Sequence, residues 1–272
     1  MPSFTGKAFA IFYKNLLGIN QSSNTGVDTT TRKIQDGAGN DTSIALADDV
    51  LEVQPVNDNT TATLRVNNSN GNAICAVDTT NSKVLVGASQ VTANTQFAHF
   101  GIHSSDAGFS AMSADTHYAV PFHTTATTTV AVSMGSSTSS SFNDTEPSTT
   151  LTISTTADDA IICYWYVMDN ITIDRVIWWQ GADAATGDST CAYVMGYDVD
   201  TSTGSTGGDL SNGTKLCSSS TVTNAGYEQG YYNQMTIHSA DVDAGQVILF
   251  TFAADTVNSD YSINATIKYH IR

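Results

Sequence analysis

Four short apolar segments between residues 43 and 87 constrain the fold of this chain more than any other feature. They lie at residues 49–53, 62–66, 73–77 and 83–86, and turn-forming stretches separate them, notably at residues 68–72 and 78–82. Their alternating apolar residues and the intervening turns predict β-strands. A small isolated sheet is only marginally stable in water, so these strands cannot enclose a core alone. We expect them to be completed by copies of themselves.

The composition extends the β prediction to the whole chain. The 272 residues include 39 Thr, 29 Ser and 19 Asn, while only 13% are charged. Of the 26 acidic residues, 23 are Asp, which suits turns and caps better than helix interiors. These residue types favour strands and turns, which excludes a mainly helical protein.

The C-terminal part, residues 119–272, is predicted to form a β-sandwich. Apolar and polar residues alternate there with a period of two, most clearly at Ile263, Ala265 and Ile267. Roughly eight to ten such segments match the size of a jelly roll or a related sandwich of two sheets. Residues 160–168 and 171–179 are apolar runs that we expect to form a buried hairpin. Residues 88–118 are expected to be a connector.

The N-terminus carries the one helix that the sequence predicts. Apolar residues at spacings near three and four indicate a short amphipathic helix over residues 5–19. Residues 20–42 are polar and should be an extended or loop-like tether, so residues 1–42 form a separate region. A helix at the end of such a tether is expected to dock on a partner. Its apolar stripe consists of Ala8, Ile11, Phe12, Leu16 and Ile19.

Charge and cysteine content exclude several classes of function. The net charge of −16 would repel nucleic acid and anionic membranes, so neither is an expected partner. No apolar run is long enough for a transmembrane helix, and no export signal is expected at the start. The four cysteines are expected to be small buried hydrophobic residues in a reducing compartment, although a bridge between Cys191 and Cys217 stays open as an alternative.

Residues 62–87 combine a hydrophobic strand, an Asn-rich turn with Gly71-Asn72, a strand ending in Val77-Asp78, a small polar turn, and a short strand ending in Gly87. This series of landmarks resembles the repeat unit of fibres and surface proteins of tailed bacteriophages. The unit occurs once here, whereas long fibres repeat it. The C-terminal part, from Ile171 to Tyr269, is also similar to the jelly-roll heads of virion proteins from marine phages.

The resemblance implies an intertwined homotrimer, with residues 43–87 as a trimeric β shaft below a jelly-roll-like head. It implies a virion structural protein, a capsid decoration or short head fibre, that assembles in the host cytoplasm and lies on the virion surface. The N-terminal helix would then be the virion anchor, which binds other virion proteins of the capsid or tail. The predicted shaft residues are Leu51, Val53, Leu64, Val66, Ile74, Val77, Val84 and Val86.

Two other functions stay open. A tail-fibre-type receptor-binding protein would recognise host surface glycans with aromatic rings and amide groups. The glycan candidates are Tyr227, Tyr231, Tyr232 and Trp179. In an alternating strand Tyr231 and Tyr232 must point in opposite directions. A polysaccharide-degrading enzyme is the third possibility, but no motif assigns catalytic residues, so we expect no enzyme.

No cofactor or metal is expected. Asp198, Asp200 and Asp209 have the spacing of oxygen ligands in a calcium loop, but Thr203 occupies the position that requires Gly. We therefore favour a plain hairpin loop there. His99 and His103 lie four residues apart, so near a trimer axis they would either gather around a metal or pack at the subunit interface.

Overall fold

A computed structural model describes residues 16–21, 26–87, 89, 91–103, 113–123, 132–135, 146–256 and 260–272. The described part is mostly β, and all its strand pairs are antiparallel. The chain divides into two compact units, Met1–Asn94 and Thr95–Arg272, which we call the N-terminal and C-terminal units. The all-β class predicted from composition is confirmed.

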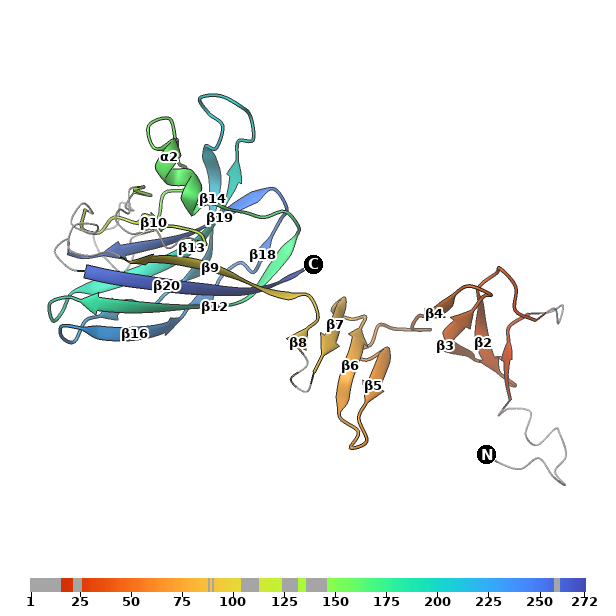
Figure 1. Cartoon of the computed structure of the whole chain (residues 1–272). Coiled ribbons are helices and arrows are strands. Elements are labelled where there is room, and N and C mark those ends of the chain that lie inside the picture. Colours follow the sequence, from red (N-terminus) through yellow and green to blue (C-terminus); the bar gives the residue numbers. More distant parts are fainter. Residues whose placement is uncertain are drawn as a thin grey trace, which may run out of the picture. The chain divides into compact units, whose positions relative to one another are not determined.

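The N-terminal unit contains two four-stranded sheets (Figure 1). The first has the order β1-β2-β3-β4 and the second the order β5-β6-β7-β8. Their strands are β1 (Leu17–Ile19), β2 (Arg32–Asp36), β3 (Asp41–Leu46), β4 (Leu51–Val53), β5 (Leu64–Asn67), β6 (Ala73–Asp78), β7 (Lys83–Val86) and β8 (Val91–Thr92).

Side-chain oxygens fix the turns between these strands. The Asn68 side chain accepts hydrogen bonds from the backbone N–H groups of Asn70 and Asn72, at 3.0 Å each, and Gly71 adopts a positive φ of 82°. The Asp78 carboxylate likewise accepts the N–H of Asn81 at 2.9 Å. Asn and Asp mimic a backbone turn in this way, and glycine tolerates positive φ.

The C-terminal unit consists of a seven-stranded and a five-stranded sheet. The seven-stranded sheet has the order β10-β19-β13-β14-β17, with β11 paired to β19 and β15 to β13. The five-stranded sheet has the order β16-β12-β20-β9, with β18 paired to β12. The strands are β9 (Thr95–His103), β10 (Tyr118–Val120), β11 (Trp165–Tyr166), β12 (Ile171–Asp183), β13 (Ser189–Val199), β14 (Leu210–Ser218), β15 (Val222–Thr223), β16 (Gln229–Gln234), β17 (Thr236–Ile237), β18 (Asp241–Val242), β19 (Gln246–Ala254) and β20 (Asp260–Ile271).

The two sheets pack face to face around one hydrophobic core. Trp178 of β12 is fully buried, and its ring centroid lies 6.3 Å from that of Phe250 and 6.0 Å from that of Phe252, both in β19. Ile263, Ala265 and Ile267 of β20 are buried in the same cluster. The period-two pattern therefore points one face of the five-stranded sheet inward, as the sequence predicts.

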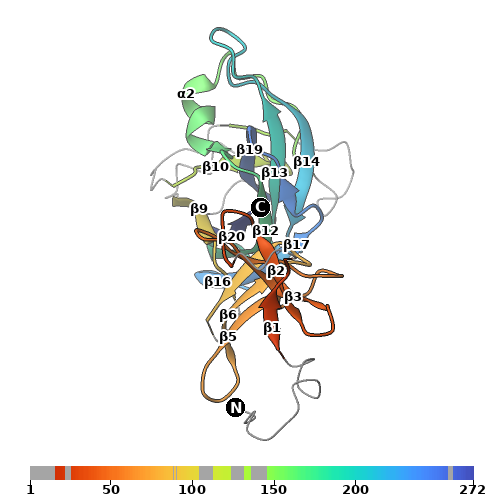
Figure 2. The same ribbon diagram turned by 90° about the vertical axis from the view of Figure 1, so that its right-hand side faces the viewer.

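The outer face of the seven-stranded sheet is covered as well. Helix α2 (Ala157–Ala160) and the following 3-10 turn η3 (Ile161–Cys163) lie beside this sheet (Figure 2). Their Ala160 and Cys163 pack in a second buried cluster with Tyr193 and Leu249. The central strand β19 is consequently buried on both faces. The five-stranded sheet differs, because its outer face carries exposed side chains such as Trp179.

The helix predicted over residues 5–19 is wrong at its C-terminal end. Residues 17–19 form β1, and Ile19 lies opposite Ile34 of β2 in the ladder. Over so short a stretch, Leu17 and Ile19 fit a period of two as well as a helical period. Leu16 precedes the strand. The remaining stripe residues Ala8, Ile11 and Phe12 lie outside the described residues.

The tether predicted over residues 20–42 contains β2 and the start of β3. Asp36 closes this hairpin, because its carboxylate accepts the N–H groups of Ala38 and Asn40 at 2.8 and 2.9 Å. The hydrogen-bonded turn and the apolar partner of Ile34 order a segment whose composition alone predicts a loop.

Two expectations about the C-terminal part are also wrong. The apolar run 160–168 does not pair with 171–179, since β11 pairs with β19 of the other sheet. The Asn170 side chain accepts the N–H of Ala244 at 2.8 Å, so the 169–170 segment crosses between sheets instead of making a hairpin turn. The connector predicted over residues 88–118 contains β9, which pairs with β20 and buries Ala98, Phe100 and Ile102 at alternate positions.

Two adjacent tryptophans test which face of the five-stranded sheet packs against the core. Trp178 is 0% exposed and Trp179 is 53% exposed. We expect Trp178→Ala to lower the free energy of unfolding by about 3–5 kcal/mol, because it leaves a cavity between the sheets. We expect Trp179→Ala to lower it by less than about 1 kcal/mol. Urea denaturation of both full-length variants measures the difference, and equal losses would contradict the assigned faces.

Candidate interaction surfaces

One face of the β5–β8 sheet carries two rows of apolar side chains. Residues opposite each other in an antiparallel ladder share a face. Leu64 lies opposite Val77, which lies opposite Val84, and Val66, Cys75, Val86 and Val91 form the next row. We call this set the apolar face. Its most exposed members are between 38% and 48% exposed: Leu64, Val66, Val84, Val86 and Val91.

The opposite face of the same sheet is mixed. Arg65, Ala76, Leu85 and Thr92 form one row of it, and Asp78 lies opposite Lys83. Ile74 alternates with Cys75 and therefore lies on this mixed face, apart from the other predicted shaft residues of the sheet. The shaft residues predicted from the sequence do not include Cys75 and Val91, which also lie on the apolar face. The period-two alternation along each strand is the sequence feature that could have identified them.

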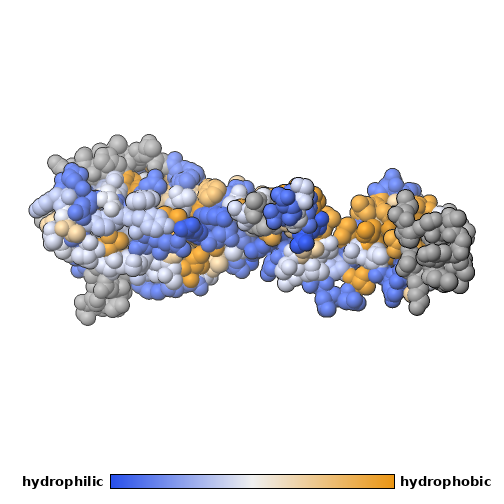
Figure 3. Space-filling view, turned by 90° about the horizontal axis from the view of Figure 1, so that it is seen from below, coloured by the Kyte–Doolittle hydropathy of each residue, from blue (hydrophilic) through white to orange (hydrophobic). Residues whose placement is uncertain are grey.

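The β1–β4 sheet repeats this feature on a smaller scale. Leu46 lies opposite Leu51, and Ile44 opposite Val53, all on one face. Leu51 is 68% exposed. Orange, hydrophobic surface gathers beside these strands at the right-hand end of the space-filling view (Figure 3). The predicted shaft residues Leu51 and Val53 therefore share a face.

A local ion pair neutralises the cation on that face. Arg32, which lies opposite Leu46, donates hydrogen bonds to both carboxylate oxygens of Asp28, at 2.5 and 2.9 Å. This guanidinium lowers the pKa of Asp28 to about 2, with a smaller contribution from the N–H of Thr30. The face thus carries no unpaired charge at Arg32.

An aromatic pair stands on the outer face of the five-stranded sheet. Trp179 of β12 lies opposite Tyr232 of β16, with ring centroids 5.2 Å apart in an edge-to-face arrangement. Both side chains are about half exposed, at 53% and 49%. The Arg175 guanidinium donates to the Tyr232 hydroxyl at 3.1 Å and to the side-chain oxygen of Gln234 at 2.7 Å. We call these four residues the aromatic platform.

Small residues and an amide surround the platform. Gly181 and Gly230 are cross-strand partners one row beyond Trp179 and Tyr232. On its other side Trp179 lies opposite Asn264, which lies opposite Gly101. Glycines leave the indole without bulky neighbours in these directions. The platform therefore offers flat apolar surface next to fixed amide and guanidinium donors.

The other two glycan candidates lie elsewhere. Tyr231 turns toward the core, and its hydroxyl donates to the side-chain oxygen of Asn224 and accepts the N–H of Ala225, both at 2.8 Å. The opposite orientations of Tyr231 and Tyr232 confirm the alternation prediction. Tyr227 is 70% exposed and precedes β16. Of the four candidates, the structure brings together Trp179 and Tyr232.

The acidic loop between β13 and β14 uses its carboxylates for internal hydrogen bonds. Asp198 accepts from the side chains of Asn212 and Gln246, which lowers its pKa. Asp200 accepts the N–H of Ser202 and Asp209 the N–H of Ile153, each at 2.8 Å. In the described part of the chain, no group of three or more His, Cys, Asp or Glu side chains is placed to hold a metal ion.

The remaining candidates from the sequence are the cysteines, for a disulfide bridge, and the histidine pair, for a metal site or a subunit interface. All four cysteines are free, so Cys191 and Cys217 form no bridge. Burial raises the pKa of the thiols of Cys163, Cys191 and Cys217 to about 12. His99 lies 3.1 Å from the Thr266 hydroxyl through Nδ1, and the side chain of His103 lies outside the described residues.

No protein-family model matches the chain, and no curated protein gives a significant match in sequence. Within the described ranges, no helix is both long enough and apolar enough to cross a membrane.

Proposed function

We propose that this chain is a homotrimeric structural protein of a bacteriophage virion, displayed as a capsid decoration or short head fibre. The observation that carries the proposal is the apolar face of the β5–β8 sheet. Two rows of cross-strand partners, from Leu64 to Val91, contain no polar side chain. Such a face in water is unfavourable unless another apolar surface covers it.

Association of identical chains relieves this cost. Covering one of these half-exposed side chains contributes roughly 1 kcal/mol, so a whole face contributes several kcal/mol per chain. A closed symmetric assembly buries the same face on every copy. The likeness of residues 62–87 to the trimeric phage repeat favours three copies around an axis. The face of the β1–β4 sheet, with Leu51 and Val53, would extend the same trimeric shaft.

The strand order of the C-terminal unit supports a jelly-roll head. Its two sheets contain β16-β12-β20-β9 and β10-β19-β13-β14, with the remaining short strands at their margins. A jelly roll of eight strands wound as two Greek keys likewise divides its strands between two packed sheets. Jelly rolls occur in viral capsid and lectin domains, so the fold suits both a decoration and a binding head.

Attachment to the virion is assigned to the N-terminus, with Ala8, Ile11 and Phe12 as the expected contacts to other capsid or tail proteins. Because Ile19 pairs within the β1–β4 sheet, the anchor would comprise residues before β1. Four free cysteines agree with folding in the reducing host cytoplasm before assembly on the virion surface.

Substitutions at two neighbouring positions of β5 test the trimer. Val66 lies on the apolar face and Arg65 on the mixed face. Light scattering of the native protein should give three times 28.7 kDa. We expect Val66→Asp to dissociate the assembly, because a buried unpaired charge costs several kcal/mol. Arg65→Asp, the matched control, should leave the mass unchanged. A native monomer, or equal effects of both variants, would refute the proposal.

The aromatic platform supports a second candidate, recognition of host surface glycans as in a tail-fibre-type receptor-binding protein. Sugar rings stack on exposed aromatic side chains while amide and guanidinium groups bind their hydroxyls. Trp179 and Tyr232 supply the rings, and Gln234, Asn264 and Arg175 supply polar groups around them. A polysaccharide-degrading activity has no observation in its favour among the described residues, and the absence of enzymatic activity stays a prediction.

Glycan recognition has its own test. We expect Trp179→Ala and Tyr232→Ala each to weaken adsorption of the protein to host cells by about tenfold or more, since a stacked ring contributes roughly 1–3 kcal/mol. Tyr227→Ala is the control, because this exposed ring lies outside the platform. Unchanged adsorption of the Trp179 and Tyr232 variants, with folding intact by circular dichroism, would exclude the platform as a glycan site.

A further inference from the structure

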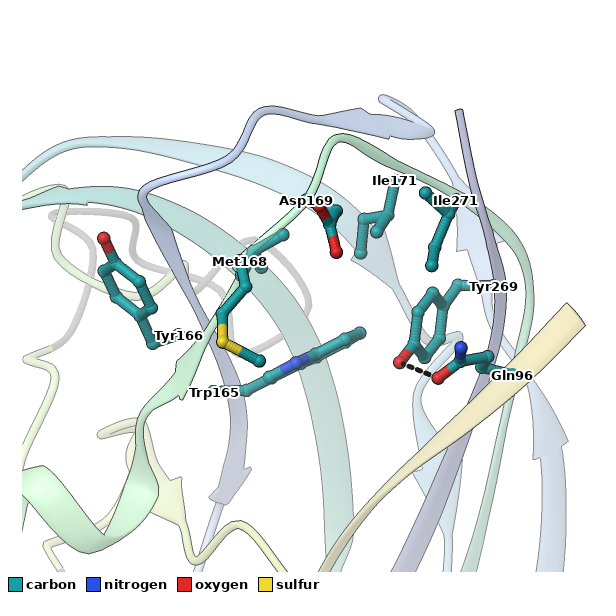
Figure 4. Close-up of a pocket in the computed structure, with 9 residues that line it drawn as sticks. Gln96, Trp165, Tyr166, Met168, Asp169, Ile171, Tyr269 and Ile271 are labelled. Atoms are coloured by element: carbon teal, nitrogen blue, oxygen red, sulfur yellow. Dashed lines mark hydrogen bonds between the residues drawn. The ribbon is translucent and has the colours of Figure 1, made fainter. Parts of the chain in front are cut away.

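A small pocket opens at one end of the sandwich, apart from the aromatic platform. It has a volume of about 220 Å³ and lies where β11 of the seven-stranded sheet approaches the start of β12 and the end of β20 (Figure 4). Its wall includes Gln96, Trp165, Met168, Asp169 and Tyr269. These residues come from distant parts of the sequence, so the fold builds the pocket.

Two aromatic rings form the inner wall of the pocket. The centroids of Trp165 and Tyr269 are 4.9 Å apart. Phe122 stacks nearly parallel to the indole at 5.8 Å, and Trp165 is only 8% exposed. The Tyr269 hydroxyl donates to the side-chain oxygen of Gln96 at 3.2 Å. These contacts hold both rings in place before any ligand binds.

The rim of the pocket carries a carboxylate and a thioether. Met168 is 81% exposed, and its side chain lies with that of Asp169 on one side of the indole (Figure 4). Asp169 is the charged residue among those that line the pocket, and no cation lines it in the described part of the chain. Arg272, next to the lining residue Ile271, is paired with Asp241 and Asp243 at 3.3 and 2.7 Å.

We propose that this pocket binds a quaternary ammonium group. The faces of Trp and Tyr rings attract cations, and Asp169 supplies a neutralising charge. A quaternary ammonium donates no hydrogen bonds, so one carboxylate beside aromatic rings satisfies it, whereas a primary ammonium has three N–H donors to satisfy. The net charge of −16 further favours a cationic ligand.

The volume sets the size of the ligand. Pockets for drug-sized molecules measure about 300–1,000 Å³, so this one suits a head group instead of a large ligand. Choline and its phosphate ester are two sources of the same group. The inference uses residues of the C-terminal unit alone, and it does not depend on the trimer or on a role in a virion.

Calorimetric titration of the full-length protein tests the chemistry of the pocket. Choline should bind at least about fivefold more tightly than 3,3-dimethylbutan-1-ol, its uncharged counterpart of the same shape, and more tightly than ethanolamine. If the ligand of the pocket is free choline, phosphocholine should bind more weakly than choline. If the ligand is the phosphate ester, phosphocholine should bind more tightly. Absence of choline binding at millimolar concentration, or equal binding of the alcohol, would overturn the proposal.

Asp169→Asn tests the site by removing the charge while keeping the shape. We expect it to weaken choline binding by about fivefold and to leave binding of the neutral alcohol unchanged. Asp183→Asn is the control, because Asp183 is an exposed carboxylate at the other end of β12. Met168→Ala, at an exposed position, should also weaken choline binding without affecting folding. Unchanged choline affinity in both pocket variants would place the cation elsewhere and overturn the assignment.

Discussion

Burial of the apolar face of the β5–β8 sheet is the interaction on which this account of the molecule depends. The C-terminal unit closes its own core, since Trp178, Phe250 and Phe252 pack between two sheets. The β5–β8 sheet differs, because Leu64, Val66, Val84, Val86 and Val91 on its apolar face are between 38% and 48% exposed. Hydrophobic surface of this extent is stable in water when it associates. From that contrast we propose that the protein self-associates, and the likeness of residues 62–87 to the phage repeat favours three copies.

The C-terminal unit shows a second asymmetry, which bears on binding. Its seven-stranded sheet is covered on both faces, through α2 and η3 on the outside. Its five-stranded sheet leaves one face in water, where Trp179 and Tyr232 pair across β12 and β16. The open sheet face thus carries the aromatic platform, while the end of the sandwich carries the pocket at Trp165 and Tyr269. The structural role proposed for the N-terminal unit is compatible with the recognition proposed for the C-terminal unit, because the two use separate parts of the chain.

Local patterns in the sequence predicted the strands well and their partners poorly. The segments at β5, β6 and β7 were found within two residues of their ends, because Asn68, Asp78 and Gly71 fix the turns. The opposite orientations of Tyr231 and Tyr232 followed from the same alternation. Pairing between distant strands decides that Trp179 meets Tyr232, that β11 joins β19, and that the pocket forms. A period of two contains no information about such partners, and at residues 17–19 it could not be distinguished from a helical period.

Cys75 reports directly on whether the apolar face is covered. It lies between Val66 and Val86 on that face, whereas the other three thiols are buried and have pKa values raised to about 12. In a thiol titration of the native protein near pH 8, Cys75 is therefore the one thiol whose accessibility decides whether a reaction occurs. The account predicts almost no reaction in the native protein and one reactive thiol per chain in the Val66→Asp variant, lost again when Cys75→Ser is added. Rapid reaction of Cys75 in the native protein, at the rate of the variant, would contradict it.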